Sequence, residues 1–154
     1  MTLTLTFGGT RGSVPSPGAS TAYFGGNTPC LELRTGTGAL MILDGGTGIR
    51  HLGRSLLERA GGKPIVADIL LSHAHWDHIQ GLPFFAPLFA AGHEFTFRAS
   101  PDALGRVEAA LRAQMTDAVF PVTFDAVRAR VHVRAPTGGE RGTGNAVRRV
   151  GRRN

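Results

Sequence analysis

The feature that most constrains this chain is a cluster of polar side chains directly after an apolar segment of strand length. Residues 64–71 (PIVADILL) are apolar and rich in β-branched side chains, which predicts a buried β-strand. The residues that follow read SHAHWDHIQGL and form an H-x-H-x-D-H pattern at His73, His75, Asp77 and His78. The predicted strand therefore brings four side chains that can bind metal to one edge of a sheet.

The residue types and their spacing predict a metal centre. Imidazole and carboxylate suit zinc and similar divalent ions, and ligands that are close in sequence cost less entropy to bring together. Side-chain direction repeats every second residue in an extended segment, so His73 and His75 can face one ion. Asp77 and His78 are then left for a second ion. The alternative is a loop that is rich in histidine by chance, but a four-position coincidence is rare in a chain with six histidines.

The remaining segments predict a mixed α/β (α+β) domain. Period-two alternation or short apolar runs predict strands at residues 2–7, 28–34, 39–44, 94–98 and 128–134. Amphipathic spacing predicts helices at residues 49–60 and 101–115, the second with Ser100 as its N-cap, and a short helical segment at residues 82–91. Residues 8–27 contain six glycines and favour a loop.

These motifs resemble the metallo-β-lactamase superfamily. The resemblance rests on the H-x-H-x-D-H pattern after an apolar strand and on the D-G-G-x-G turn at residues 44–48. The segments GGTRGSVPSPG, FGGNTPCLEL and SHAHWDHIQGLPFF are similar to those of the branch that contains ribonuclease Z and the cyclic-nucleotide or cyclic-phosphate phosphodiesterases. The resemblance extends over residues 1–134.

The resemblance implies a fold, a cofactor and a reaction. It implies the N-terminal half of a four-layer αββα sandwich, two divalent ions that are most often zinc (with manganese or iron as alternatives), and hydrolysis of a phosphodiester in RNA or a cyclic phosphate. It also implies a catalytic role for Asp77 beside the attacking water. Members of the superfamily carry further His, Asp and His ligands later in the chain. We interpret their absence from this sequence as a truncated or frameshifted copy.

Asp44 is the predicted support of the metal ligands. Metal-bound histidines usually give their other ring N–H to a carboxylate or carbonyl, and Asp44 lies at the end of a predicted strand. The resembling superfamily has an aspartate of this kind, whereas a turn-forming aspartate is the alternative. We expect His51, His93 and His132 to have no metal role, and Cys30 to be a strand residue rather than a nucleophile.

Charge distribution suggests two further hypotheses. The net charge is +6, and residues 135–154 supply +4 of it through five arginines and one glutamate. This glycine-rich tail is predicted to be disordered. The alternatives to a hydrolase are an inactive fragment, or a non-catalytic nucleic-acid-binding protein that uses the Arg-rich tail. In the other hypothesis, two chains form a homodimer that completes the core. The chain has no apolar run long enough to span a membrane and its first residues do not form a signal peptide, which predicts a cytoplasmic protein without a membrane partner.

Overall fold

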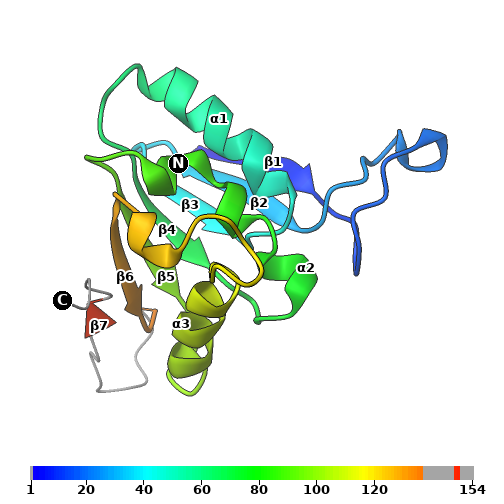
Figure 1. Ribbon diagram of the computed structural model, residues 1–154. Helices are drawn as coiled ribbons and strands as arrows, with labels where there is room; N and C mark the ends of the chain where they lie inside the picture. Colours follow the sequence, from blue (N-terminus) through cyan, green and yellow to red (C-terminus); the bar gives the residue numbers. More distant parts are fainter. Residues whose placement is uncertain (1, 137–147, 150–154) are drawn as a thin grey trace.

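The computed structural model describes residues 2–136 and 148–149 (Figure 1). They form one seven-stranded sheet whose strands lie in sequence order. The strands are β1 (Leu3–Gly9), β2 (Cys30–Thr35), β3 (Leu40–Leu43), β4 (Val66–Leu70), β5 (Glu94–Arg98), β6 (Arg130–Arg134) and β7 (Arg148–Arg149). The helices are α1 (Gly48–Ala60), α2 (Trp76–Ile79) and α3 (Leu104–Ala113), with short 3-10 turns η1 (Ala19–Thr21), η2 (Leu82–Phe84), η3 (Ala86–Phe89) and η4 (Phe124–Ala126).

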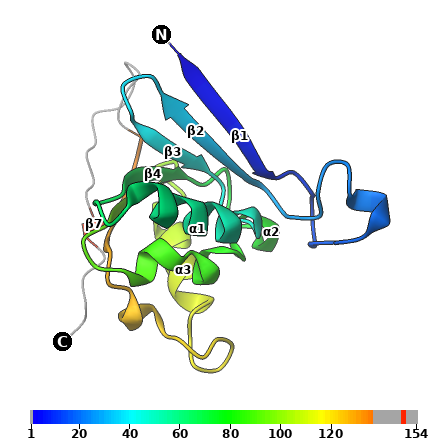
Figure 2. The ribbon, with the colours of Figure 1, turned by 90° about the horizontal axis from the view of Figure 1, so that it is seen from above.

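The strand directions explain why the helices share one side of the sheet. Strands β1, β2 and β3 pair antiparallel, β3 through β6 pair parallel, and β7 pairs antiparallel with β6. Parallel neighbours need a crossover, and crossovers are nearly always right-handed. Because each new strand is added at the same edge, the crossovers place α1, α2 and α3 on one face, as Figure 2 shows. The mixed α/β class is confirmed, with one helical layer on one sheet as in half of a four-layer sandwich.

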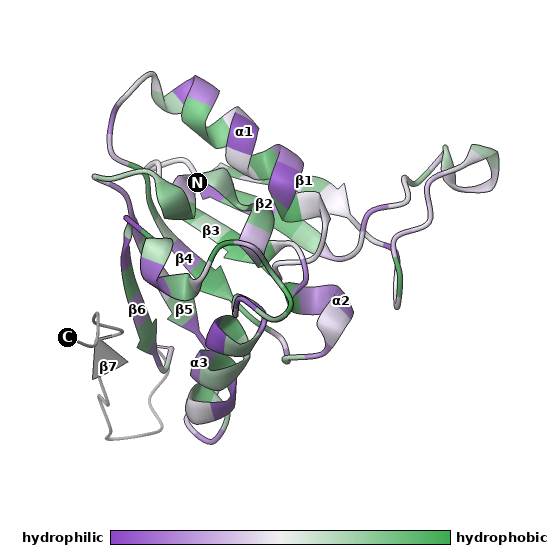
Figure 3. Ribbon diagram, in the orientation of Figure 1, coloured by the Kyte–Doolittle hydropathy of each residue, from purple (hydrophilic) through white to green (hydrophobic). Residues whose placement is uncertain are grey.

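The hydrophobic core lies between this helical layer and the sheet. Ile42, Ile69, Phe95 and Phe97 are fully buried on the sheet side. The helices contribute buried side chains at Ile49, Leu52 and Leu56 of α1 and at Leu104, Val107 and Leu111 of α3. In Figure 3, α1 alternates between hydrophobic and hydrophilic residues, as expected for a helix with one buried face. The apolar spacing in the sequence therefore identified the buried faces of both helices.

The opposite face of the sheet is apolar over its first strands. Cross-strand pairs place Leu5 opposite Leu33 and Phe7 opposite Leu31 on this face. Leu31 and Leu33 in turn pair with Leu43 and Met41. The prediction that residues 2–7 form a half-buried strand is wrong in its burial, because Leu3, Leu5 and Phe7 are 62%, 44% and 63% exposed. The alternation directs these side chains away from the helices.

Three predicted elements differ from the structure. The helix predicted to start at Pro101 begins at Leu104 after Ala103, and Ser100 does not cap it. Residues 82–91 form two 3-10 turns, each with a proline in its first positions, rather than one helical segment. Strand β4 is buried on one face only, because Val66 is exposed. In each case a local pattern was correct but its extent was set by proline or by tertiary packing.

Most of the predicted C-terminal tail, residues 135–154, lies outside the described residues, so its disorder and its proposed binding role stay predictions. Its described residues are 135–136 and the two-residue strand β7. Among the described helices, none is long and apolar enough to cross a bilayer. The cytoplasmic location stays a prediction.

Candidate metal centre

The predicted ligands lie at the carboxyl end of β4, at the edge where ligands bind in open parallel sheets. Strand β4 ends at Leu70, and the polar segment then leads into the short helix α2, which starts directly after His75. The neighbouring strand β3 ends beside it, since the Asp44 N–H donates to the Leu70 carbonyl at 2.8 Å. This contact brings Asp44 to the residues that follow β4, although the two are far apart in sequence.

The three histidines of the motif pack against one another. The ring centroids of His73 and His75 are 4.4 Å apart, and those of His73 and His78 are 4.1 Å apart. The carboxylate of Asp77 is close to the same group, with Oδ2 3.5 Å from Nε2 of His78. All four predicted ligands therefore gather at one place, on the loop after β4 and on α2.

Asp44 and Ser72 contact the histidine rings of this cluster. Asp44 is 8% exposed, and its Oδ2 lies 2.9 Å from Nδ1 of His78. Its Oδ1 accepts hydrogen bonds from the Ser72 backbone N–H at 2.8 Å and the Ser72 hydroxyl at 2.9 Å. The Ser72 hydroxyl is also 3.0 Å from Nδ1 of His73. A carboxylate can only accept, so Nδ1 of His78 donates to Asp44, while Nε2 faces the carboxylate of Asp77.

Ser13 is a contact of the cluster that the sequence did not indicate. Its backbone N–H donates to Oδ2 of Asp77 at 2.8 Å. This hydrogen bond is the largest reason that the pKa of Asp77 lies below its usual value, with the neighbouring His78 and His73 adding to the effect. Ser13 belongs to residues 10–27, which extend as an arm from the body of the molecule (Figures 1 and 2). No local pattern in the sequence singled out Ser13.

The two non-glycine residues with positive φ in the described part of the chain both belong to this region. Ser13 has φ 70° and Asp44 has φ 61°. Such left-handed conformations cost free energy for residues with a Cβ and cluster at functional sites. Ser13 uses this conformation to direct its N–H at Asp77, and Asp44 uses it to turn its carboxylate toward Ser72 and His78.

The donor set fits a divalent ion in its chemistry. Three imidazoles and one carboxylate are the ligand types that zinc prefers, and a carboxylate behind a ligating histidine is the usual support. Within the described residues, however, no group of three or more His, Cys, Asp or Glu side chains is arranged to hold an ion. The side chains are thus gathered at one place, and their roles as ligands stay predictions.

The other candidate residues lie elsewhere. His51 is exposed on α1, and His93 is buried with Nδ1 accepting the Ile65 N–H at 3.0 Å. His132 faces Glu94 from β6, with Nε2 3.5 Å from Oε1 of Glu94. Burial, with Asp44 and Glu32 nearby, raises the pKa of the Cys30 thiol to about 12, which leaves it protonated and unreactive.

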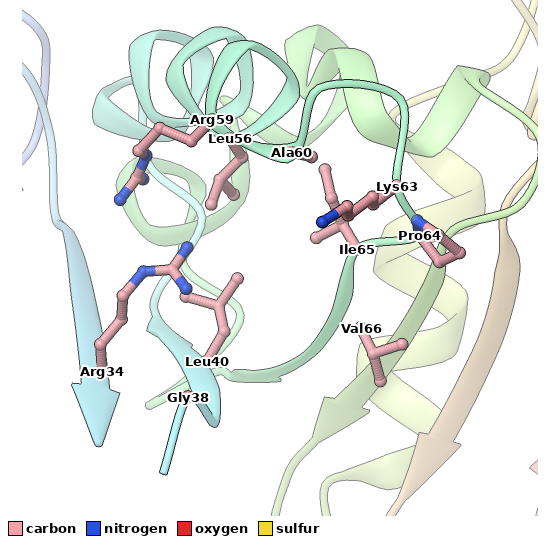
Figure 4. A pocket seen from close by; sticks show the side chains of 10 residues that line it. All are labelled: Arg34, Gly38, Leu40, Leu56, Arg59, Ala60, Lys63, Pro64, Ile65 and Val66. Carbon is pink, nitrogen blue, oxygen red and sulfur yellow. The ribbon is translucent and has the colours of Figure 1, made fainter. Parts of the chain in front are cut away.

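Three cavities are relevant to binding. A pocket of about 240 Å³ lies beside the cluster and includes Ser72, His73, Ser100 and Arg106. An apolar pocket of about 580 Å³ borders α2 on its other side. A third pocket, of about 490 Å³, is lined by the C-terminal part of α1 and the starts of β3 and β4, and has the cationic side chains Arg34, Arg59 and Lys63 (Figure 4).

Comparisons with known proteins agree with the superfamily resemblance. A family model for the metallo-beta-lactamase superfamily matches residues 23–94, slightly less than half of the chain, and this segment contains Asp44 and all four predicted ligands. No curated protein matches the sequence significantly. A similar solved structure is that of a Thermotoga maritima protein provisionally named a metallo-beta-lactamase, with 19% identity and a TM-score of 0.46. The match covers 90% of this chain and 60% of that protein's chain.

Proposed function

We propose that this chain carries the metal-binding part of a hydrolase that cleaves phosphodiester bonds, in RNA or in a cyclic phosphate. The observation that carries the proposal is the gathering of His73, His75, Asp77 and His78 at the end of β4, with Asp44 on Nδ1 of His78. The superfamily match supports metal-dependent hydrolysis in general. The choice of a phosphodiester is supported by the motif resemblance and by Arg106, which lines the pocket beside His73 and suits a phosphate oxygen.

The residues of the cluster have separable roles in this proposal. His73 and His75 would hold one divalent ion, and Asp77 and His78 the other, with zinc as the first choice of metal. The ions would supply a water of lowered pKa at neutral pH and polarise a phosphoryl oxygen. Asp77 is an ionised carboxylate at neutral pH, and the lowered pKa keeps it so in more acidic solution, so it would accept a hydrogen bond from the attacking water. Asp44 would keep the ring of His78 in the tautomer that offers Nε2.

The alternative of a nucleic-acid-binding protein that acts through its Arg-rich tail is not favoured, because the superfamily match supports a metal-dependent hydrolase instead. A homodimer is a separate proposal, which depends on the sheet face that the helices leave uncovered. The Thermotoga maritima protein is longer than the region matched here, so the activity of a whole protein of this type belongs to the proposal.

Metal stoichiometry tests the proposal most directly. The chain is purified, loaded with zinc and measured by elemental mass spectrometry on the fraction collected from size-exclusion chromatography. We expect the wild type to bind zinc and both His75→Ala and Asp77→Ala to lose it. His51→Ala is the matched control, because His51 is exposed on α1, away from the cluster. Equal zinc content in the wild type, His75→Ala and Asp77→Ala would contradict the assignment of these residues as metal ligands.

Activity is measured separately on the same fractions. The probe is bis(p-nitrophenyl) phosphate, a chromogenic phosphodiester, at neutral pH with and without a chelator. We expect turnover by the zinc-loaded wild type and by His51→Ala, and loss of turnover in Asp77→Ala. Zinc binding without phosphodiester turnover would leave the metal centre intact and contradict the choice of reaction.

A further inference from the structure

The apolar pocket of about 580 Å³ is next to the candidate metal centre and has a composition that the proposed reaction does not explain. One of its walls is α2, the helix that also carries Asp77 and His78. From this helix Trp76 and Ile79 line the pocket, and the facing wall comes from α3 and the segment after it. A group that enters this pocket therefore lies against the helix that carries Asp77 and His78.

The walls of the pocket are aromatic and open to a ligand. Trp76 is 59% exposed and Phe84 is 53% exposed. Phe84 packs edge-on against Phe120, with ring centroids 5.3 Å apart, which fixes the orientation of both rings. Exposed aromatic side chains that are held in place are the usual platform for a flat, unsaturated ring system, and base stacking on such rings is favourable.

One polar side chain interrupts the apolar lining. Gln114 is only 6% exposed, and both its side-chain nitrogen and its side-chain oxygen are buried with no hydrogen-bond partner among the described residues. An unsatisfied buried polar group costs about 1–3 kcal/mol. Gln114 also lines the pocket. Both polar atoms are covered in this structure, so pairing with a ligand requires the carboxamide to turn about its terminal torsion, which is broad in glutamine.

A primary carboxamide offers a donor and an acceptor side by side. The complementary ligand has an acceptor and a donor in the same spacing on the edge of a flat ring, which is the arrangement on the edge of a nucleobase. We propose that this pocket binds the base of a nucleotide phosphodiester, with Gln114 pairing to the base edge and the rings of Trp76, Phe84 and Phe120 forming its apolar surroundings. The inference rests on the proposed function for the position of the phosphodiester beside the pocket.

The experiment uses the intrinsic fluorescence of Trp76, the one tryptophan of the chain, in metal-free protein. Titration with AMP is compared with ribose 5-phosphate, which lacks the base, and with phenyl phosphate, which has a ring without a pairing edge. We expect saturable quenching by AMP and at least about tenfold weaker binding of the other two, as the loss of one bidentate pair predicts. A short oligoadenylate is the further arm, and tighter binding of it than of AMP would indicate a base within RNA as the source.

Two variants connect the effect to the pocket. Gln114→Leu keeps the side-chain volume and removes the unsatisfied amide, so we expect unchanged or higher thermal stability together with about tenfold weaker AMP binding. A residue with a merely structural role would not give this combination. Phe84→Ala removes a ring that is 53% exposed, so we expect the variant to fold, and it should weaken AMP binding several-fold through lost stacking even if Gln114→Leu folds poorly.

The outcomes separate this inference from the proposed function. Equal quenching by AMP and ribose 5-phosphate, equal quenching by AMP and phenyl phosphate, or no saturable quenching would each overturn the base site. None of these results depends on bound metal or turnover. His51→Ala, which changes an exposed residue of α1, is the matched control and is expected to bind AMP like the wild type. A chain that binds zinc but shows no preference for AMP would retain its proposed function and lose the base site.

Discussion

Asp44 is a residue whose backbone and side chain are both committed to the candidate centre. Its φ of 61° is left-handed, and its carboxylate accepts from Ser72 and contacts His78. Asn tolerates this backbone conformation nearly as well as Asp does, whereas Ala does not. The two substitutions therefore separate the contribution of the charge from that of the conformation.

We predict that Asp44→Asn lowers the free energy of unfolding by about 1–3 kcal/mol, because the amide has one acceptor oxygen where the carboxylate has two. Asp44→Ala should cost roughly 1 kcal/mol more through its left-handed backbone. Urea unfolding of the two variants measures both changes in the free energy of unfolding. If Asp44 also supports a metal ligand, zinc affinity falls about 10- to 100-fold in Asp44→Asn. Asp125→Asn, on an exposed turn, is the matched control, and equal stability of all four proteins would contradict the network.

At the scale of the element, Glu32 links β2 to α1 through a buried carboxylate. Its Oε1 lies 2.6 Å from Nε of Arg34, and its Oε2 lies 2.8 Å from Nη2 of Arg59 on the helix. Burial alone would raise the pKa of Glu32, but the hydrogen bonds and charges of Arg59 and Arg34 outweigh burial and lower it. The side chains of both arginines line the cationic pocket of Figure 4. The carboxylate of Glu32 therefore holds the side chains of Arg34 and Arg59 in place between β2 and the C-terminal end of α1.

The lowered pKa gives this link a definite pH dependence. A depressed folded-state pKa stabilises the fold above the unfolded-state value, near 4.5, and that stability is lost as pH falls through the folded-state pKa. We predict that Glu32→Gln is less stable than the wild type at pH 7 in urea unfolding, and that the difference shrinks below pH about 4.5. Glu58→Gln, exposed on α1, is the control. A difference that stays constant from pH 7 to pH 3 would contradict the ion-pair explanation.

The elements also show what the sequence could and could not predict. Strand β5 and the buried faces of α1 and α3 followed from local periodicity, which depends only on neighbouring residues. The start of α3 was wrong because a proline at the first helical position favours a start without requiring one. Ser13 could not be found, because it meets Asp77 across 64 positions and presents a backbone N–H that any residue carries. The role of Asp44 behind a metal ligand stays a prediction, and its observed contact with His78 depends on the parallel pairing of β3 with β4.

At the scale of the whole molecule, the sheet has two faces of different character. The helices cover one face (Figure 2), while the other is apolar over β1, β2 and β3, mixed over β4, and polar over β5 and β6. On the polar part, Asp68 pairs with Arg98, with Oδ1 3.0 Å from Nε. Among the described residues, the apolar part of this face has no ion pair of this kind. Exposed apolar patches mark interaction surfaces or cause aggregation. The edge strand β1 adds an unpaired row of backbone groups.

This asymmetry predicts that the chain self-associates through the apolar part of the sheet. Two such faces can pack as sheets do in a sandwich, with their strands nearly aligned. We expect the wild type to be oligomeric or poorly soluble in size-exclusion chromatography with light scattering. Leu5→Thr combined with Phe7→Thr should shift it toward the monomer, because threonine keeps the β-propensity of the strand while removing apolar surface.

The matched control changes the other side of the same strand. Thr4→Ser combined with Thr6→Ser alters two side chains that alternate with Leu5 and Phe7, so it leaves the apolar face intact and should not change the oligomeric state. Because Leu5 and Phe7 are largely exposed, their replacement should change the free energy of unfolding by less than about 1 kcal/mol. A wild-type chain that is a monodisperse monomer at high concentration and unfolds cooperatively would show that this face is stable in water. That result would contradict the homodimer hypothesis.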